Sequence, residues 1–316
     1  MLNTTAASEA KFTSSPERLS LSVKLRIFAG DIKIAHTVFA LPFALLSTFL
    51  ASRETERTGL PRPGKLLLIV VCMATARTVA MAANRLLDAT LDARNPRTAR
   101  RAIPSGTLSR AFYAAATCLC VAGFIAATAG FLIAYRNPWP LIFSVPVLAF
   151  VSAYPFLKRF SQLCHYYLGA ALALAPVCAW IAIRGRLDAP PLWMAGAVLC
   201  WTAGFDIIYA CQDYASDLAC GVFSVPAKFG IPAALWISRA THLISAAMLV
   251  ALGYSTRHFH TLYFVGVCLA IVLLLVEQSL VRPTNLSKIG LAFFTVNGII
   301  SLMLGTLGIL DIVLHQ

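Results

Sequence analysis

Long apolar segments separated by short polar ones make up most of the chain. None of these segments alternates apolar and polar residues, as the strands of a membrane β-barrel do. A helix needs about 17–25 residues to cross a bilayer, and the segments reach that length, the fourth only marginally. We therefore predict an all-α integral membrane protein with nine transmembrane helices. They are expected at residues 34–51, 65–87, 111–134, 139–155, 163–183, 191–211, 234–253, 259–280 and 288–312.

The N-terminal stretch before the first apolar segment is polar and rich in serine and threonine. It lacks the apolar core of a secretory signal peptide. We predict a disordered cytoplasmic tail over residues 1–30 and a transmembrane domain over residues 31–316. An organellar transit peptide is the alternative for the tail, although Glu9 and Glu17 are unusual in such peptides, which are poor in acidic residues.

Only 12% of the residues are charged and 59% are hydrophobic, whereas about 25% are charged in a typical soluble domain. The net charge is nevertheless +13, which would also suit a protein that binds nucleic acid. With the N-terminus in the cytoplasm, 17 of the 26 lysines and arginines fall in the tail and the inner loops, and 8 in the outer loops. This asymmetry follows the positive-inside rule. We therefore predict a multi-pass protein of the cell (inner) membrane, with no nucleic-acid partner.

Two acidic motifs of equal spacing stand at the inner ends of the second and sixth predicted helices. The first contains Asn84, Asp88 and Asp92, and the second contains Tyr209, Asp213 and Asp217. A spacing of four residues keeps side chains on one face of a helix. The negative end of the helix dipole disfavours each carboxylate there by about 0.3–1 kcal/mol, and like charges four residues apart add a further cost. These carboxylates therefore require cations nearby.

Two kinds of cation fit this pattern. Basic side chains predicted on the same side would form a rim of Asp–Arg salt bridges, or would serve only as positive-inside anchors. Alternatively, the facing carboxylate pairs suit Mg²⁺, which commonly takes one or two carboxylates together with the phosphates of a substrate. The basic residues would then bind a diphosphate, which guanidinium groups grip with two hydrogen bonds. The candidates are Arg97, Arg101, Lys158 and Arg159.

Three stretches resemble the UbiA superfamily of membrane prenyltransferases. "NRLLDATLDARNPRTARRAIPSG", residues 84–106, resembles the first signature of that family. "YACQDYASD" is similar to its second aspartate motif, and "YPFLKRF", residues 154–160, to the basic loop between the two. The similarity extends over roughly residues 33–310, with the motifs in the family's order. The resemblance implies a helical bundle around a central cavity.

The resemblance also implies a reaction. Family members transfer a polyprenyl chain from its diphosphate to an acceptor, usually an aromatic ring, with Mg²⁺. Two acceptors remain open, 4-hydroxybenzoate in ubiquinone biosynthesis and a dihydroxynaphthoate in menaquinone biosynthesis. By residue-level resemblance, Asn84 would support the first metal site, and Arg97 and Lys158 would bind the diphosphate. The Mg²⁺ ligands implied in this way are Asp88, Asp92, Asp213 and Asp217.

Two ionisable residues, Arg77 and Asp206, lie deeper in the predicted helices than the acidic motifs. Ionisable groups at membrane depth are costly and usually line a functional cavity. The two side chains would either form a structural salt bridge with each other, or Arg77 would bind the carboxylate of an aromatic acid. In the second case Asp206 would orient the ring hydroxyl or Arg77 itself. Tyr209 is a candidate for stabilising a carbocation through its ring face.

Other classes of membrane protein explain the pattern less fully. A polytopic transporter with a cytoplasmic acidic and basic rim would account for the helices and buried charges, but it does not require two aspartate pairs on one side. A CDP-alcohol phosphotransferase also uses membrane aspartates and magnesium, but its glycine-bearing DGxxAR run is absent from the sequence. We therefore predict a polyprenyltransferase and retain the transporter as the alternative.

Overall fold

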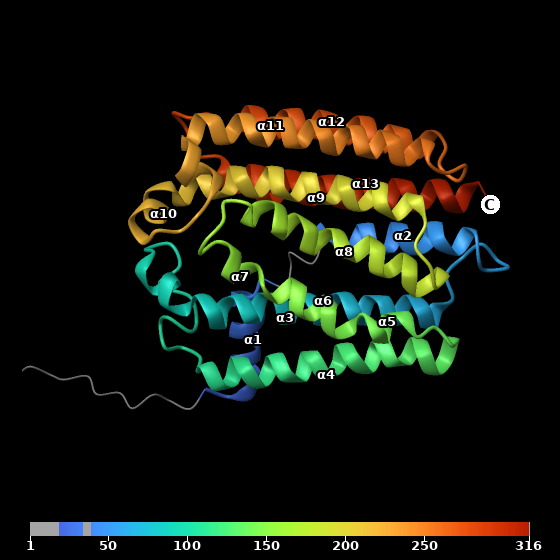
Figure 1. The fold of residues 1–316 in the computed structure, drawn as a ribbon, viewed down its shortest axis with the longest axis horizontal. Helices are drawn as coiled ribbons and strands as arrows, with labels where there is room; N and C mark the ends of the chain where they lie inside the picture. Colours follow the sequence, from blue (N-terminus) through green and yellow to red (C-terminus); the bar gives the residue numbers. More distant parts are fainter. Residues whose placement is uncertain (1–18, 34–38, 316) are drawn as a thin grey trace, which may run out of the picture.

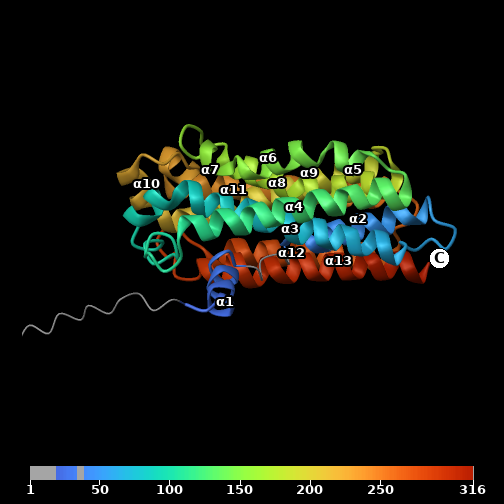
Figure 2. The same ribbon diagram turned by 90° about the horizontal axis from the view of Figure 1, so that it is seen from below.

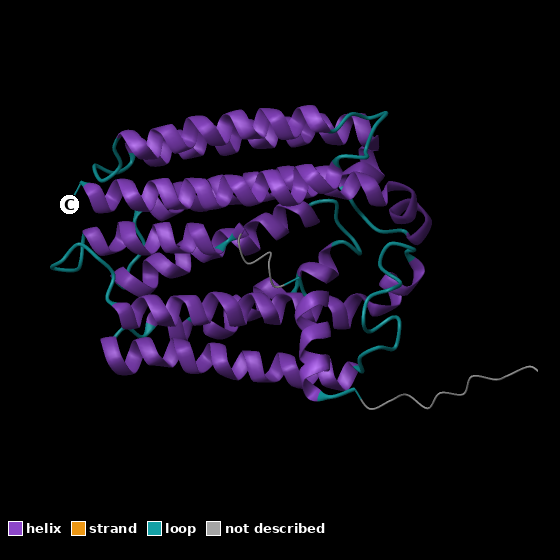
Figure 3. Ribbon diagram, turned by 180° about the vertical axis from the view of Figure 1, so that it is seen from behind, coloured by secondary structure: helices purple, strands orange, loops and turns teal. Residues whose placement is uncertain are grey.

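The computed structural model describes residues 19–33 and 39–315, and this part of the chain contains helices and no strand (Figure 1, Figure 3). Its helices, in chain order, are α1 (Leu21–Asp31), α2 (Leu41–Arg53), α3 (Pro63–Arg94), α4 (Arg110–Tyr135), α5 (Trp139–Ile142), α6 (Ser144–Ser152), α7 (Tyr154–Leu157), α8 (Cys164–Arg184), α9 (Ala189–Ala210), η2 (Cys211–Asp213), α10 (Tyr214–Cys220), α11 (Val225–Tyr254), α12 (Thr261–Leu280), η3 (Leu291–Val296) and α13 (Asn297–Leu314).

The nine predicted transmembrane helices are not confirmed, because only seven helices in the described residues are long and apolar enough to cross a membrane. The predicted fourth helix is broken into the short helices α5, α6 and α7. Each piece contains a proline, Pro140, Pro146 or Pro155, and proline removes a backbone hydrogen bond and clashes with the preceding turn. The predicted first helix corresponds to α2, which has 13 residues, and residues 34–38 lie outside the described part.

The long helices run side by side in one bundle (Figure 1, Figure 2). Helix α9 packs against α8 on one side and α11 on the other, while α2 packs against α8 and α13, and α3 against α4 and α6. The apolar window of α9 is 72% buried, the largest share among the candidate spans. Side chains on α9 are therefore enclosed by protein rather than by lipid over most of the membrane depth.

Helix α1 corrects the predicted tail boundary, because residues 21–30 are helical (Figure 2). Ser20 caps the helix by accepting a hydrogen bond from the amide of Val23 at 3.4 Å. At the other end, Asp31 accepts hydrogen bonds from the hydroxyl of Tyr113 and from the amide of Ala102, the latter at 3.3 Å. The predicted disorder of residues 1–18 concerns residues outside the described part.

Helix α11 begins at Val225 rather than at the predicted residue 234, and the chain bends within it. Gly230 adopts φ 79° and ψ 160°, two residues before Pro232. Proline disfavours a helical conformation in the residues just before it, and glycine adopts a positive φ without the cost of a Cβ atom. The segment before the bend carries the loop after α10 back toward α8.

The packing of α8 on α9 is close enough to predict the effect of one added methyl group. A Cβ atom on Gly169 would lie 2.3 Å from the backbone oxygen of Leu199, so Gly169→Ala must push the two helices apart. Overpacking of this kind costs about 1–3 kcal/mol. We expect the apparent Tm of the detergent-solubilised protein to fall by several degrees, measured by thermal denaturation followed by size-exclusion chromatography.

Gly298→Ala is the matched control, because a Cβ atom there meets nothing within 4 Å and alanine favours a helix over glycine by about 1 kcal/mol. We expect its Tm to be unchanged or raised. Equal Tm values for the two variants would show that α8 and α9 are not in close contact at Gly169.

Candidate active site

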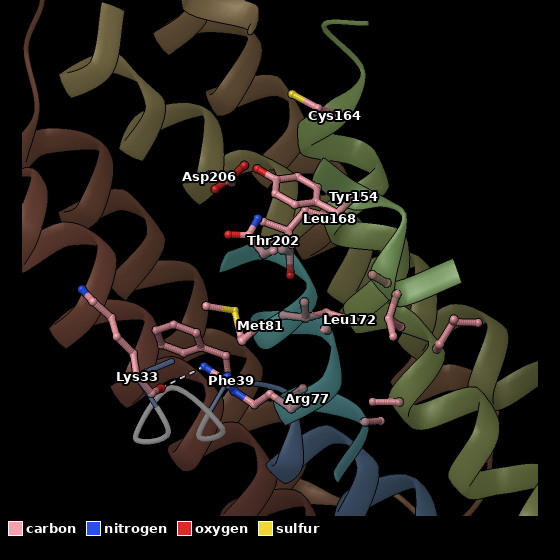
Figure 4. A pocket seen from close by; sticks show the side chains of 18 of the residues that line it. Lys33, Phe39, Arg77, Met81, Tyr154, Cys164, Leu168, Leu172, Thr202 and Asp206 are labelled. Atoms are coloured by element: carbon pink, nitrogen blue, oxygen red, sulfur yellow. Dashed lines mark hydrogen bonds between the residues drawn. The ribbon is translucent and has the colours of Figure 1, made fainter. Parts of the chain in front are cut away.

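One cavity of about 470 Å³ lies between α3, α8, α9 and η3. Its walls are mostly apolar, with Phe39, Leu172 and Phe205 among the lining side chains. Charged residues from both acidic motifs line its polar end, among them Asp92, Asp213 and Asp217 together with basic residues. Figure 4 shows part of the wall, with Asp206 and Tyr154 in one region and Arg77 with Lys33 in another. The cavity therefore joins a charged end to an apolar interior.

The first acidic motif lies on one continuous helix, as the spacing predicted. Asp88 is fully buried and forms an ion pair with Lys158. Arg159 lies 3.6 Å from Asp88 Oδ1, and Asn84 Nδ2 donates to Asp88 Oδ2 at 3.3 Å. Asp88 and Arg159 are not among the residues that line the cavity, whereas Asn84 and Lys158 are. Asp88 therefore stands behind the wall.

Asp92, one turn further along α3, does line the cavity. Arg101 donates from Nη1 to both of its carboxylate oxygens at 2.7 Å. The hydroxyl of Thr98 donates to the backbone oxygen of Asp92 at 2.9 Å, which ties the loop after α3 to the end of the helix. The loop after α3 thus brings Arg101 back over the first acidic motif.

The second motif departs from the predicted single helix face. Helix α9 ends at Ala210, and Asp213 is the last residue of the 3₁₀ turn η2. A 3₁₀ turn has three residues per turn rather than 3.6, so Asp213 is rotated relative to its expected position. Arg97 reaches it with two hydrogen bonds, Nε to Oδ1 at 2.8 Å and Nη2 to Oδ2 at 2.7 Å. Asn95 adds a third at 3.2 Å.

Asp217 lies on the short helix α10 and forms no ion pair with a basic side chain in the described part of the chain. It accepts a hydrogen bond from the hydroxyl of Ser224 at 2.8 Å. The loop that carries Ser224 is fixed to the basic segment after α7, because the amide of Phe223 donates to the backbone oxygen of Lys158 at 2.8 Å. The second acidic motif and the basic segment are therefore held against each other.

The charges at this end favour an anion. Burial lowers the pKa of Lys33, and the positive charges of Arg101, Arg85 and Arg97 lower it further. Burial also opposes the charge on Arg97, but its hydrogen bonds with Asp213 and the charge of that carboxylate outweigh burial and raise the pKa of Arg97. Several basic side chains thus share one small region of the cavity, where an anionic ligand would relieve their mutual repulsion.

The donor set was tested for its fit to Mg²⁺. Among the described residues, no three His, Cys, Asp or Glu side chains converge as a preformed metal site. Mg²⁺ does not need such a site, because it commonly binds one or two carboxylates, several waters and substrate phosphates. Asp88 Oδ1 is buried without a hydrogen-bond partner, and all of the acids offer hard oxygen donors. The residues therefore fit Mg²⁺ that arrives with a diphosphate.

The salt bridge considered between Arg77 and Asp206 does not form, because each has another partner. Arg77 Nη2 donates to the backbone oxygen of Lys33 at 3.1 Å. Asp206 Oδ2 instead lies 2.7 Å from His165 Nδ1. Both Arg77 and Asp206 line the cavity, in separate regions of its wall (Figure 4). Because both side chains line the cavity, each lies where a ligand in the cavity would contact it.

Aromatic rings form the wall next to the second motif. The ring of Tyr209 lies 4.1 Å from that of Phe293, and Phe293 packs edge-on against Phe205 at 5.1 Å. Arg97 donates to the hydroxyl of Tyr209 at 3.3 Å and lies 5.5 Å above its ring. Tyr209 therefore belongs both to the charged end and to the apolar wall.

Sequence reasoning missed two functional candidates. Arg85 is 3% exposed and donates to Asn84 Oδ1 at 3.0 Å and to the backbone oxygen of Asp31. The position of Arg85 directly after Asn84 in the first motif could have identified it as a candidate. Nothing in the sequence indicated that His165 contacts Asp206, because the two residues are 41 positions apart.

Comparison with known proteins agrees with the predicted family. The model of the UbiA prenyltransferase family matches residues 40–299. A 4-hydroxybenzoate octaprenyltransferase of Shewanella frigidimarina is 30% identical over 213 residues, which are 67% of this chain and 72% of that protein. A protein of the same name from Edwardsiella ictaluri is 31% identical over 219 residues, 69% of this chain and 74% of its own length.

Solved structures agree as well. A UbiA homolog from Aeropyrum pernix K1 superposes with a TM-score of 0.77 at 28% identity, covering 88% of this chain and 98% of its own. A homolog from Archaeoglobus fulgidus bound to DMAPP and Mg²⁺ has the same fold, with a TM-score of 0.68 at 19% identity and coverage of 90% and 99%. From the family match, the relatives and the shared fold, we conclude that the chain belongs to the UbiA prenyltransferase family and is a membrane-embedded prenyltransferase.

Proposed function

We propose that the protein transfers a polyprenyl chain from its diphosphate to an aromatic acid, with Mg²⁺ as the cofactor. The observation that carries this proposal is the cavity, in which three acids of the two motifs, Asp92, Asp213 and Asp217, gather with basic side chains at one end of an apolar interior. The charged end suits a metal diphosphate and the apolar part suits an isoprenoid chain. The names of the relatives, which act on 4-hydroxybenzoate, support an aromatic acid as the acceptor.

The charged end would bind the metal and the diphosphate. Asp88, Asp92, Asp213 and Asp217 would hold Mg²⁺, with Asn84 supporting the first pair. Mg²⁺ when bound would neutralise the negative charge that develops on the departing diphosphate. Arg97, Arg101, Lys158 and Arg159, whose cationic groups lie beside these acids, would donate hydrogen bonds to the phosphate oxygens.

The apolar part would hold the allylic end of the chain away from water. The carbon–oxygen bond to the diphosphate breaks, and the electron-rich ring forms a new carbon–carbon bond with the allylic carbon. Water at this point would quench the electrophile, and the apolar wall would protect the reaction from it. The rings of Tyr209 and Phe293, 4.1 Å apart, face this region and would stabilise positive charge.

Arg77 would bind the carboxylate of the acceptor, because Arg77 lines the cavity and, within the described residues, donates to a backbone oxygen and pairs with no carboxylate. Asp206 would contact the acceptor from the other side (Figure 4). Both 4-hydroxybenzoate and a dihydroxynaphthoate carry a ring carboxylate and a phenolic hydroxyl, so both suit this arrangement. The excess of basic residues at the charged end supports a cytoplasmic orientation of that end in the inner membrane.

Replacement of Asp213 tests the chemistry. Asp213→Asn keeps the size of the side chain but removes the charge that Arg97 contacts and that a metal would require. We expect kcat to fall by about 10²–10³-fold, the usual loss for one electrostatic group that stabilises a transition state. The assay supplies a long polyprenyl diphosphate and each acceptor to isolated membranes, and product is detected by mass with Mg²⁺ or with EDTA.

The matched control is Asp188→Asn. Asp188 lies in the loop before α9, where it accepts hydrogen bonds from Trp180 and Arg184, and it does not line the cavity. Its product formation should match that of the wild type. Activity of Asp213→Asn equal to that of the control, or wild-type product in EDTA, would contradict the proposed metal–diphosphate end.

Arg77→Met tests acceptor binding separately. We expect the KM for the aromatic acid to rise by about tenfold or more, since a hydrogen bond to a charged group contributes about 1.5–3 kcal/mol. The KM for polyprenyl diphosphate should stay unchanged, because the hydrogen bond of Arg77 goes to the backbone of Lys33 and not to an acid of the two motifs or a basic side chain paired with them. Steady-state kinetics with each substrate varied in turn gives both values.

Arg77→Lys is the companion variant, because it keeps a positive charge without the guanidinium fork. We expect its KM for the acid to lie between those of the wild type and Arg77→Met. An unchanged KM for the acid in Arg77→Met would remove Arg77 from the acceptor site.

A further inference from the structure

A buried acid–histidine pair faces the cavity outside the two acidic motifs. Asp206 on α9 and His165 at the start of α8 are 8% and 2% exposed. Asp206 Oδ2 lies 2.7 Å from His165 Nδ1. The amide of Val225 donates to the other ring nitrogen, Nε2, at 3.2 Å. Both nitrogens of the ring are therefore engaged, one by the acid and one by the backbone.

The backbone contact fixes the form of the histidine. Because the amide of Val225 can only donate, His165 Nε2 must accept and carries no proton. The proton of the neutral ring then sits on Nδ1, which donates to Asp206 Oδ2. This arrangement occupies one oxygen of Asp206 and fixes the plane of its carboxyl group.

The other carboxylate oxygen of Asp206, Oδ1, has different surroundings from Oδ2. Asp206 Oδ1 accepts no hydrogen bond from the described part of the chain, and the side chain lines the cavity with 12% of its surface exposed. Tyr154 and Thr202 lie next to it (Figure 4). Asp206 thus has one carboxylate oxygen without a hydrogen bond from the described residues at the wall of the cavity, where a proton donor on a ligand would be a partner for it.

The depth of Asp206 suits an aromatic ring. It precedes Asp213 by seven positions, roughly 10 Å of helix, and Arg77 precedes Asp88 by eleven positions, roughly 16 Å. An acceptor with its carboxylate at Arg77 and its reacting carbon toward the diphosphate would place its ring at about the level of Asp206. The acid is therefore located beside the ring rather than beside the phosphates.

We propose that Asp206 is the general base that removes the ring proton after prenyl transfer, with His165 as the residue that positions it. This inference rests on the proposed function. Once the new carbon–carbon bond has formed and the diphosphate has left, the attacked ring carbon still carries its hydrogen. Asp206 Oδ1 takes that proton, and the electron pair of the carbon–hydrogen bond returns to the ring and restores its aromaticity. The proton exchanges with water after the product leaves.

Deuterium at the reacting ring carbons of 4-hydroxybenzoate provides the test, since proton removal is the only step that breaks this bond. In the wild type, we expect kcat to be the same with the deuterated and the ordinary acid. In Asp206→Asn, we expect kcat to fall by about 10²-fold or more, the usual contribution of a general base. Because proton removal becomes the slow step, the deuterated acid should then react at least about twofold more slowly than the ordinary acid.

His165→Gln serves as the second variant, because a glutamine amide can still donate to Asp206 but does not hold its plane. We expect a smaller fall in kcat together with a measurable isotope effect. Asp188→Asn, in the loop before α9, should show neither change. A Tm close to that of the wild type and unchanged binding of polyprenyl diphosphate would establish that each variant is folded.

The outcomes separate this inference from the proposed function. A lower kcat in Asp206→Asn without an isotope effect, or a change confined to the KM of the acid, would overturn the assignment and leave Asp206 as a binding residue. If Asp206→Asn does not fold, the absence of an isotope effect in His165→Gln overturns it. Failure of the wild type to form any product would instead reject the proposed function.

Discussion

The structure depends on keeping several carboxylates at one end of a membrane bundle, where both the helix dipole and their mutual repulsion oppose them. Three of the four acids obtain a basic partner from a segment distant in sequence or across a loop. Asp88 pairs with Lys158, Asp92 with Arg101, and Asp213 with Arg97. These contacts fix the loops after α3 and α7 over the end of α9, so the charged end of the cavity is assembled by its own electrostatics.

The same pairing explains how a charged site can exist without its ligands. A buried carboxylate without a partner would be protonated or would destabilise the fold. Basic side chains that lie against the acids avoid this cost, and they are also the groups suited to phosphate. Exchange of their partners from carboxylate to phosphate, with a divalent ion taking the carboxylates, keeps every charge compensated. The salt bridges and the proposed binding site would thus be two states of one set of residues.

The sequence predicted the first motif well because its geometry is local. Asp88 and Asp92 lie on the continuous helix α3, as their spacing required. Asp213 was misplaced because the 3₁₀ turn before it brings its carboxylate to Arg97, a residue 116 positions away. The break in the predicted fourth helix could have been inferred from its prolines. The contact between Asp206 and His165 could not have been inferred, because the two residues are 41 positions apart and no local pattern links them.

The position of Asp206 on α9 has a physical advantage for proton transfer. Helix α9 is the most enclosed of the candidate spans. His165 on α8 contacts Asp206 and is itself fixed by the amide of Val225 at the start of α11. A base on a lipid-facing helix would be free to change rotamer, whereas the contact with His165 restrains Asp206. Rigid placement lowers the reorganisation required when a charge forms or disappears next to it.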